Sequence, residues 1–416
     1  MAVNELFLCM SVACFCLHGA WAFVPNKGFG LVSAAFGTTH SKMTRSAALE
    51  VTADLLRDNP NPDPTVDSTG GIDALSTLTP RNLITAYYGT AGERVRAYQH
   101  AVGDIRSGNS KVDISKAERK LALAHFDSEQ FQAGQNRLID FKELSIKAIQ
   151  SNRFTSARKL AGRALHTLQD FYSHSNWVEM GMNDPYSVLG KRGQKPDNVA
   201  PLAMRTCSDC ERTLSTCNNN ILANINQRRI LTSGYYSGQV DDGGRRIAKA
   251  SGKCSHGGVL DSSRNQPATG GINKDSTSSF WSPHHYNHDK AVDIATKASV
   301  DFLQNIRSQV NDDSKYAAFL GLKLQAAMSP TDEPVASPSI ISISYVIDTT
   351  GSMSEELPEI QRALPQIRIQ LDRYIQSLGE NVQVRFILVP FNDPGEFIAL
   401  NFDKVYIEGL HLVINQ

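Results

Sequence analysis

The pattern of hydrophobic and polar positions divides the chain into a long helical part, a loop-rich part and a shorter part with strands. Between about Thr39 and Glu179, apolar residues recur at spacings of three and four, strong helix formers dominate and glycine is sparse, which predicts amphipathic helices. Three prolines interrupt this pattern over Asn59 to Pro64 and predict a loop. The helical spacing returns from Asp289 to Met328. We therefore expect a mostly α-helical region.

The texture of the sequence changes between about residues 181 and 287. Glycine, serine and asparagine become more frequent there, and the helical spacing of apolar residues is lost. This composition is typical of loops and turns between helices or strands. We therefore expect a long insertion within the helical region.

The last part of the chain has the pattern of a parallel α/β unit. A polar segment from Pro330 to Pro338 precedes an apolar run from Ile340 to Ile347. A helical pattern over Glu355 to Leu378 and a second apolar run over Val382 to Phe391 follow. Strand, helix and strand in this order predict two parallel strands, and we expect the outer edge of the second strand to stay unpaired.

These patterns predict a multidomain chain with a mostly α N-terminal domain and a partial α/β domain of Rossmann-like type. The expected boundaries are a signal peptide over 1–22, a helical domain over 23–328, a linker over 329–339 and an incomplete α/β domain over 340–416.

The first residues have the features of a secretory signal peptide. An apolar run from Leu6 to Leu17 is followed by Ala20 and Ala22, which suit cleavage before Phe23. An uncleaved anchor is the alternative, but His18 and the shortness of the run argue against a spanning helix. No other apolar stretch reaches the roughly 18 residues of a transmembrane segment. We expect a secreted, extracellular protein.

Charge composition narrows the expected partners. The 416-residue chain has 42 Lys plus Arg and 42 Asp plus Glu, and its apolar content of 41% is that of globular proteins. A balanced charge lacks the basic footprint of a nucleic-acid-binding protein. The expected partner is an extracellular protein or matrix ligand, and we expect no binding of nucleic acid.

Four cysteines remain once the signal peptide is removed, and all lie in the insertion: Cys207, Cys210, Cys217 and Cys254. Cys207 and Cys210 have the spacing of half a zinc site, which Cys217, Cys254 or His256 would complete. Secretion favours two disulfides instead. The three possible pairings stay open at this point.

Three candidate metal ligands follow one another at helical spacing. His166, Asp170 and His174 stand at i, i+4 and i+8, so each is rotated by about 40° and displaced by about 6 Å from the one before it. The two histidines are then about 12 Å apart along the axis, too far to share one ion. Asp170 between them predicts a multinuclear site. Pairs on the surface of a helix are the alternative.

Further histidine segments resemble those of the zinc-dependent phospholipase C and heterokaryon-incompatibility C families. These segments are Thr39-His40-Ser41, His125-Phe126-Asp127 and Pro283 to Asp289, together with the helix of His166. The resemblance implies a Zn²⁺ cluster with ligands from the set His40, His125, Asp127, His166, Asp170, His174, His285, His288 and Asp289. It also implies hydrolysis of a phosphodiester, for which Asp127 is the candidate catalytic carboxylate and Asp58 and Asp63 are the alternatives.

The end of the first predicted strand resembles the metal-ion-dependent adhesion site of von Willebrand factor A domains. Asp348, Thr350 and Ser352 fill the pattern of its first loop, which implies Mg²⁺ bound through hard oxygen ligands. A polar turn that caps a helix is the alternative. Residues 395–416 contain no clear equivalent of the further loops of that family, so we expect the site and the domain to be incomplete.

Three functions follow from these observations. The two resemblances in this order favour a binding or adhesion protein that also binds metal. An active zinc-dependent phosphodiesterase or phospholipase is the first alternative, and a structural scaffold whose histidines only satisfy hydrogen bonds is the second.

Overall fold

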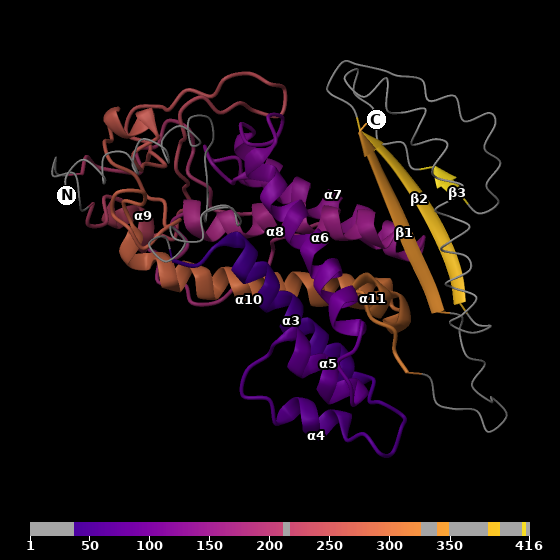
Figure 1. Cartoon of the computed structure of the whole chain (residues 1–416). Helices are drawn as coiled ribbons and strands as arrows, with labels where there is room; N and C mark the ends of the chain where they lie inside the picture. Colours follow the sequence, from indigo (N-terminus) through magenta and orange to yellow (C-terminus); the bar gives the residue numbers. More distant parts are fainter. Residues whose placement is uncertain (1–36, 211–216, 326–338, 349–381, 392–409, 413–416) are drawn as a thin grey trace, which may run out of the picture. The chain divides into compact units, whose positions relative to one another are not determined.

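The computed structural model describes residues 37–210, 217–325, 339–348, 382–391 and 410–412, and the chain divides into two units, residues 1–327 and 328–416. The first unit is helical, as the sequence predicts (Figure 1). Its α-helices are α3 (His40–Asp58), α4 (Ser68–Asp73), α5 (Pro80–Tyr88), α6 (Arg94–Ile114), α7 (Phe131–Gln150), α8 (Phe154–His174), α9 (Ala223–Gln227), α10 (His288–Val310) and α11 (Asp313–Phe319). Three short 3-10 helices are η1 (Ala122–Ala124), η2 (Ser262–Asn265) and η3 (His285–Asn287).

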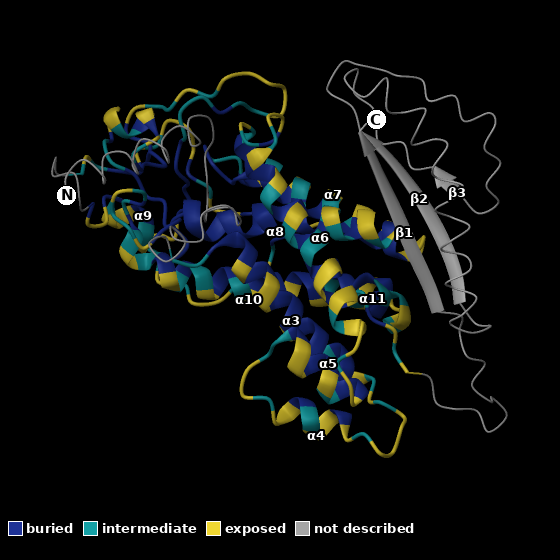
Figure 2. Ribbon diagram, viewed as in Figure 1, coloured by how far each residue is buried: buried dark blue, intermediate teal, exposed yellow. Residues whose placement is uncertain are grey.

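Helix α8 is the centre of the first unit. It packs against α6, α7 and α10, and the second half of its length is buried (Figure 2). The contact with α6 is made at glycines: a Cβ atom at Gly162 would lie 2.0 Å from the carbonyl oxygen of Ile105. Gly108 on α6 faces α8 in the same way, with the carbonyl oxygen of Lys159 at 2.3 Å from its added Cβ. Two backbones can approach this closely only where no side chain intervenes.

Local signals explain several helix ends. The Thr39 side chain accepts a hydrogen bond from the backbone of α3, and Thr79 followed by Pro80 starts α5. The helical pattern that begins at Asp289 forms two helices instead of one, because α10 ends at Val310. Asn311 there adopts a left-handed φ of 50°, and Asp312 then caps α11.

The insertion is mostly loops, as expected, and it has a small core of its own. That core contains Cys207, Ile221, Ile225, Ile230, Cys254, Ala268 and Ile272. Disulfides join Cys207 to Cys254 and Cys210 to Cys217. The disulfide interpretation of the cysteines is therefore confirmed, and a zinc site with cysteine ligands is excluded because all four sulfurs are used in these bonds.

The second unit contains the two predicted strands in parallel. β1 (Ser339–Asp348) pairs with β2 (Val382–Phe391) over its whole length, from Ser339 opposite Val382 to Asp348 opposite Phe391. The expectation that the second strand stays unpaired at its outer edge is wrong, because β3 (Leu410–Leu412) pairs with β2 in parallel.

Several predicted features lie outside the described residues. They are the signal peptide over 1–22, the helix over Glu355 to Leu378, and Thr350 and Ser352. Within the described parts of the chain, no helix has both the length and the apolar character needed to cross a membrane.

Candidate metal centre

Helix α8 presents its predicted ligands to the interior of the helical unit. His166, Asp170 and His174 are fully buried. Buried charged or polar groups of this kind persist only when hydrogen bonds, ion pairs or metal ions compensate the loss of water. Neighbouring elements supply further histidines and carboxylates, and together they form three groups of candidate ligands.

The first group joins α3 to α8. It consists of His40, His166 and Asp170, whose candidate ligand atoms all lie within 4.8 Å of one another. His40 Nε2 is 3.1 Å from Asp170 Oδ1, and His166 Nε2 is 3.1 Å from Asp170 Oδ2. Asp170 therefore uses its two oxygens toward two different histidines.

The second group adds α6 and the segment after η1. Asp113, His125 and His166 lie within the same 4.8 Å limit. His125 Nδ1 is 2.8 Å from Asp170 Oδ2, and His166 Nε2 is 3.4 Å from Asp113 Oδ1. Both groups share His166, so they form one continuous cluster around Asp170.

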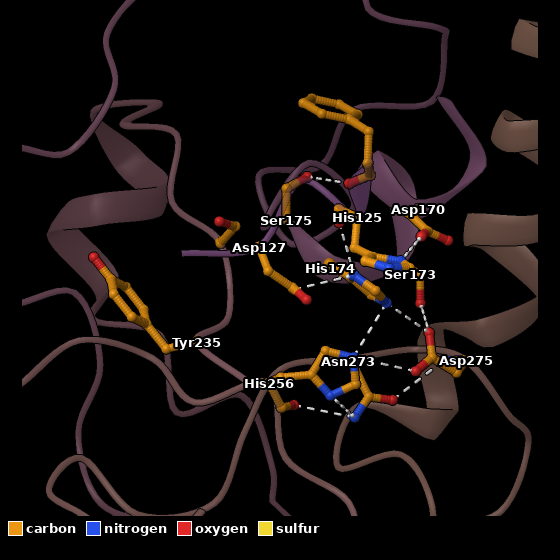
Figure 3. A network of polar contacts seen from close by, with 12 residues as sticks. His125, Asp127, Asp170, Ser173, His174, Ser175, Tyr235, His256, Asn273 and Asp275 are labelled. Atoms are coloured by element: carbon orange, nitrogen blue, oxygen red, sulfur yellow. Dashed lines mark hydrogen bonds and ion pairs between the residues drawn. The ribbon is translucent and has the colours of Figure 1, made fainter. Parts of the chain in front are cut away.

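The third group lies at the end of α8 and reaches into the insertion. His174, Asp127 and His256 form it, and Figure 3 shows Asp275 beside them. The Nε2 atoms of His174 and His256 are 3.1 Å apart, and Asp275 Oδ1 is 3.2 Å from His174 Nε2. Asp127 approaches His174 from the other side, with Oδ1 3.1 Å from Nδ1.

Outer hydrogen bonds orient the imidazoles of this cluster. His40 Nδ1 lies 2.7 Å from Gln169 Oε1, and His166 Nδ1 lies 3.3 Å from Asn109 Oδ1. The amide nitrogen of Gln169 donates to Thr44 and Ser299, which fixes Gln169 Oε1 as an acceptor. Each Nδ1 then carries a proton, and each Nε2 faces the carboxylates across a gap that a proton or a metal ion can bridge.

The third group follows this arrangement in part, because Asp127 Oδ1 also lies 3.1 Å from His174 Nδ1. His174 Nδ1 donates to the carbonyl oxygen of His125 at 2.9 Å, and His256 Nδ1 donates to that of Gly257 at 3.0 Å. The two Nε2 atoms face each other at 3.1 Å. Lone pairs at this distance repel unless a proton or a cation lies between them, and ligand atoms around tetrahedral Zn²⁺ are separated by about 3.3 Å.

Several carboxylate and imidazole atoms of the cluster make no hydrogen bond. Two of them, Asp113 Oδ2 and His125 Nε2, have no ion-pair contact with a described residue either, whereas Asp113 Oδ1, Asp127 Oδ1 and Asp170 Oδ1 each lie near one imidazole nitrogen. A buried polar atom without a partner is rare and needs an explanation. Nitrogen and carboxylate oxygen ligands of this kind suit Zn²⁺, so the residues present fit a zinc cluster.

The pKa values of the buried histidines also indicate a site that favours positive charge. Burial alone would lower the pKa of His166, but Asp170 and Asp113 outweigh burial and raise it to about 10. Burial opposes charge at His174 as well, yet Asp127 and Asp275 hold the pKa of His174 well above its usual value. The negative charge of the four buried carboxylates must be balanced by positive charge, which protons or metal ions can supply. These carboxylates are Asp113, Asp127, Asp170 and Asp275.

The segment that carries Asp127 is held in an unusual conformation. Phe126, Ser128 and Glu129 have φ angles of 52°, 56° and 59°, values that cost about 1 kcal/mol or more for residues with a side chain. Glu129 holds the segment in place by accepting hydrogen bonds from Thr232 and the backbone of Ser233. The insertion therefore fixes the position of Asp127.

The structure brings most of the predicted zinc ligands together and leaves three apart. His40, His125, Asp127, His166, Asp170 and His174 belong to the cluster. Asp289 is exposed and His285 is half-buried. Both ring nitrogens of His288 make hydrogen bonds to the backbone: Nδ1 donates to the carbonyl oxygen of Lys274 at 2.7 Å, and Nε2 accepts from the N–H of Thr38 at 3.0 Å.

The histidines that Asp170 contacts also differ from those that the spacing predicts. The spacing predicts that it lies between ions held by His166 and His174, whereas its oxygens contact His40, His125 and His166. His174 joins the separate third group because the chain after α8 turns toward the insertion, where His256 and Asp275 lie.

Sequence reasoning missed Asp113 and Asp275 and considered His256 only as a partner of cysteines. One signal was present for Asp113, because Asn109 and Asp113 interrupt the apolar stripe of α6 that contains Tyr98, Val102 and Ile105. Polar residues on a buried stripe indicate a function or a buried network. His256 and Asp275 stand in loops, where no periodicity marks them.

Asp348 is the last residue of β1. It therefore lies at the carboxyl end of a parallel strand, the edge at which α/β sheets bind ligands. The other two predicted Mg²⁺ ligands, Thr350 and Ser352, lie outside the described residues.

Comparison with known proteins identifies related chains. A family model described as the VWA7 N-terminal domain matches residues 78–316, and one described as the von Willebrand factor A domain matches residues 342–404. The first match includes every candidate ligand of the cluster except His40. The second confirms that this part of the chain resembles a von Willebrand factor A domain.

Two relatives extend the likeness along the chain. The mouse von Willebrand factor A domain-containing protein 7 is 38% identical over 379 residues, and the human protein of that name is 37% identical over 376 residues. Each comparison covers 90% of this chain but only 38% of the relative. No solved structure matches the chain. The family model that covers more than half of the sequence shows that the chain belongs to the family of the VWA7 N-terminal domain.

Proposed function

We propose that the helical unit binds two or three Zn²⁺ ions in the buried cluster and that this metal stabilises a secreted binding protein. One observation carries the proposal: the imidazoles of His40, His166 and His256 direct Nδ1 to outer acceptors and Nε2 to carboxylates. Histidines that ligate zinc have this arrangement, because the outer acceptor fixes the tautomer and the ring orientation.

Burial favours a structural role for the metal over catalysis. His40, His125, Asp127, His166, Asp170 and His174 are each 0% exposed. Structural zinc sites are closed, whereas catalytic sites keep an open position for water and substrate. A phosphodiester would have to reach the cluster through packed side chains, so we propose that the domain stabilises the chain and does not hydrolyse a phosphodiester.

The binding role rests on the second unit and on the N-terminus. The match to the von Willebrand factor A domain supports a binding-type protein, and the apolar run from Leu6 to Leu17 supports export. We propose that Asp348, Thr350 and Ser352 contribute to a Mg²⁺-dependent contact with an extracellular protein or matrix ligand.

Metal analysis of the purified full chain tests the zinc proposal. We expect two or three zinc ions per chain, and a loss of at least one ion in His166→Ala, because His166 belongs to two ligand groups. His100→Ala is the matched control, since His100 is exposed on α6. Equal zinc content in wild type and His166→Ala would contradict the proposal.

Two assays test the rest of the proposed function. We expect no turnover of phosphatidylcholine or of a chromogenic phosphodiester, and turnover abolished by His166→Ala would favour the enzyme instead. We also expect Mg²⁺-dependent retention on immobilised extracellular matrix, weakened by Asp348→Ala. Retention that is the same in EDTA and in that variant would rule out the adhesion site.

A further inference from the structure

A pocket of about 440 Å³ lies beside α8, away from the metal cluster. It is an open pocket lined by residues of α7, α8, α10 and the loop over residues 185–191. No residue of the three ligand groups lines it. Its volume is within the range of about 300 to 1,000 Å³ that is usual for small-molecule sites.

The inner wall of this pocket is apolar. It is formed by buried or largely buried side chains of α8, α10 and the loop, namely Leu168, Tyr172, Leu189, Ala298 and Phe302. The hydroxyl of Tyr172 accepts a hydrogen bond from the backbone of Tyr186 at 3.0 Å, which ties the loop to α8. A wall of this kind accepts the apolar body of a ligand.

Lys142 lines the pocket and introduces a buried positive charge. The residue is only 4% exposed. Its ammonium group donates to the carbonyl oxygen of Gly190 at 2.5 Å and to Asn305 Oδ1 at 2.7 Å. Both acceptors are neutral. Within the described part of the chain, Lys142 forms no ion pair, and the adjacent Glu143 is paired with Arg192.

A buried ammonium group without a carboxylate partner is energetically unfavourable. Burial accordingly lowers the pKa of Lys142. An anionic ligand would supply the missing negative charge, and a hydrogen bond from an ammonium group to a carboxylate is stronger than one between neutral groups.

The mouth of the pocket has little further net charge. Asp301 and Lys191 both line it and are exposed, with opposite charges. Gln304 and Ser308 of α10 add neutral polar groups at the mouth. Lys142 therefore contributes the uncompensated charge of the pocket.

We propose that this pocket binds an amphipathic carboxylate, with the carboxylate at Lys142 and the apolar body against Phe302 and Leu168. The proposal does not depend on the zinc cluster, because the pocket and the cluster share no residue.

Isothermal titration calorimetry of the full chain with decanoate tests this site. We expect saturable binding of one decanoate per chain and binding of decanol that is weaker by about tenfold or more, since decanol lacks the charge. Lys142→Met should weaken decanoate binding by a similar factor. Lys147→Met, an exposed lysine of the same helix, is the control.

A second variant separates the pocket from the stability of Lys142. Ser308→Trp places a large side chain at the exposed mouth and should abolish decanoate binding while the thermal unfolding temperature stays near that of wild type. The proposal fails if decanoate does not bind, if decanol binds equally well, or if decanoate binds equally to wild type and Ser308→Trp.

Discussion

His256 stands 82 residues after His174 in the sequence, yet their Nε2 atoms are 3.1 Å apart. Because the imidazole of His256 belongs to the third ligand group only, we expect His256→Ala to lose about one zinc ion per chain and to keep the others. Metal analysis of the purified variant checks this.

His285→Ala is the control for that variant, because His285 has a predicted ligand motif but lies outside the cluster. We expect its zinc content to equal that of wild type. A loss of zinc in His285→Ala, or an unchanged zinc content in His256→Ala, would show that the third group is assigned wrongly.

Residue spacing predicted the cluster only where the ligands share a helix or a short motif. The i, i+4, i+8 series of α8 placed His166, Asp170 and His174 in one buried row. It could not identify Asp275, because loops bring this residue to α8 through contacts distant in sequence, such as the hydrogen bond from Ser173 to Asp275. His288 has a ligand-like neighbourhood in sequence, but hydrogen bonds to backbone groups account for its burial.

Glu179 illustrates a buried charge outside the metal cluster. Its side chain is 1% exposed and lies 3.0 Å from Lys274 Nζ and 2.6 Å from His284 Nδ1. Burial would raise the pKa of this carboxyl group, but Lys274 and His284 outweigh burial and lower the pKa to about 2. The carboxylate therefore stabilises the fold above the pKa of the unfolded chain, near 4.3.

That stabilisation is lost as the pH falls from about 4.5 toward 2. We expect Glu179→Gln to lower the free energy of unfolding by about 3 kcal/mol at pH 7, and less at pH 3. Urea unfolding between pH 2 and 7 measures this. Glu93→Gln, at an exposed glutamate, is the control, and the same loss at both pH values would contradict the expectation.

At the scale of elements, the crossing of α6 and α8 determines whether the cluster forms. Gly162 lets the backbone of α8 approach α6, which places Asn109 of α6 beside the His166 ring. We expect Gly162→Ala to destabilise the fold by about 3 kcal/mol, because its new Cβ would meet backbone atoms that cannot move separately.

Gly103→Ala is the matched control, since a Cβ atom at this position of α6 meets nothing within 4 Å. This variant should be more stable than wild type by about 0.5 to 1 kcal/mol, because glycine is unfavourable within helices. Denaturant midpoints measure both changes. Equal effects of the two substitutions would show that the crossing is not tightly packed.

Periodicity predicted the helices around α8 and both long strands, because each buries one stripe or one apolar run. It did not predict the break between α10 and α11, since the left-handed conformation of Asn311 depends on the local backbone. It also did not predict the pairing of β3, since this strand contains only three residues.

At the scale of the whole molecule, the ligands come from elements far apart in the chain, from His40 in α3 to Asp275 in the insertion. Metal bound there would hold α3, α6, α8 and the insertion together. We expect removal of zinc by a chelator at neutral pH to lower the unfolding temperature by about 10 °C or more. Calorimetry before and after dialysis measures the shift.

Readdition of Zn²⁺ should restore the unfolding temperature, and readdition of Mg²⁺ should not, because imidazole nitrogens prefer zinc. An unfolding temperature that does not respond to chelation would leave the buried histidines as a hydrogen-bonded network only.

The third ligand group also makes the helical framework dependent on the insertion. His174 belongs to the helical framework, whereas His256 and Asp275 come from the cysteine-rich segment. Deletion of this segment would remove His256 and Asp275 and leave only Asp127 beside His174. The helical framework and the cysteine-rich segment therefore depend on each other at this group.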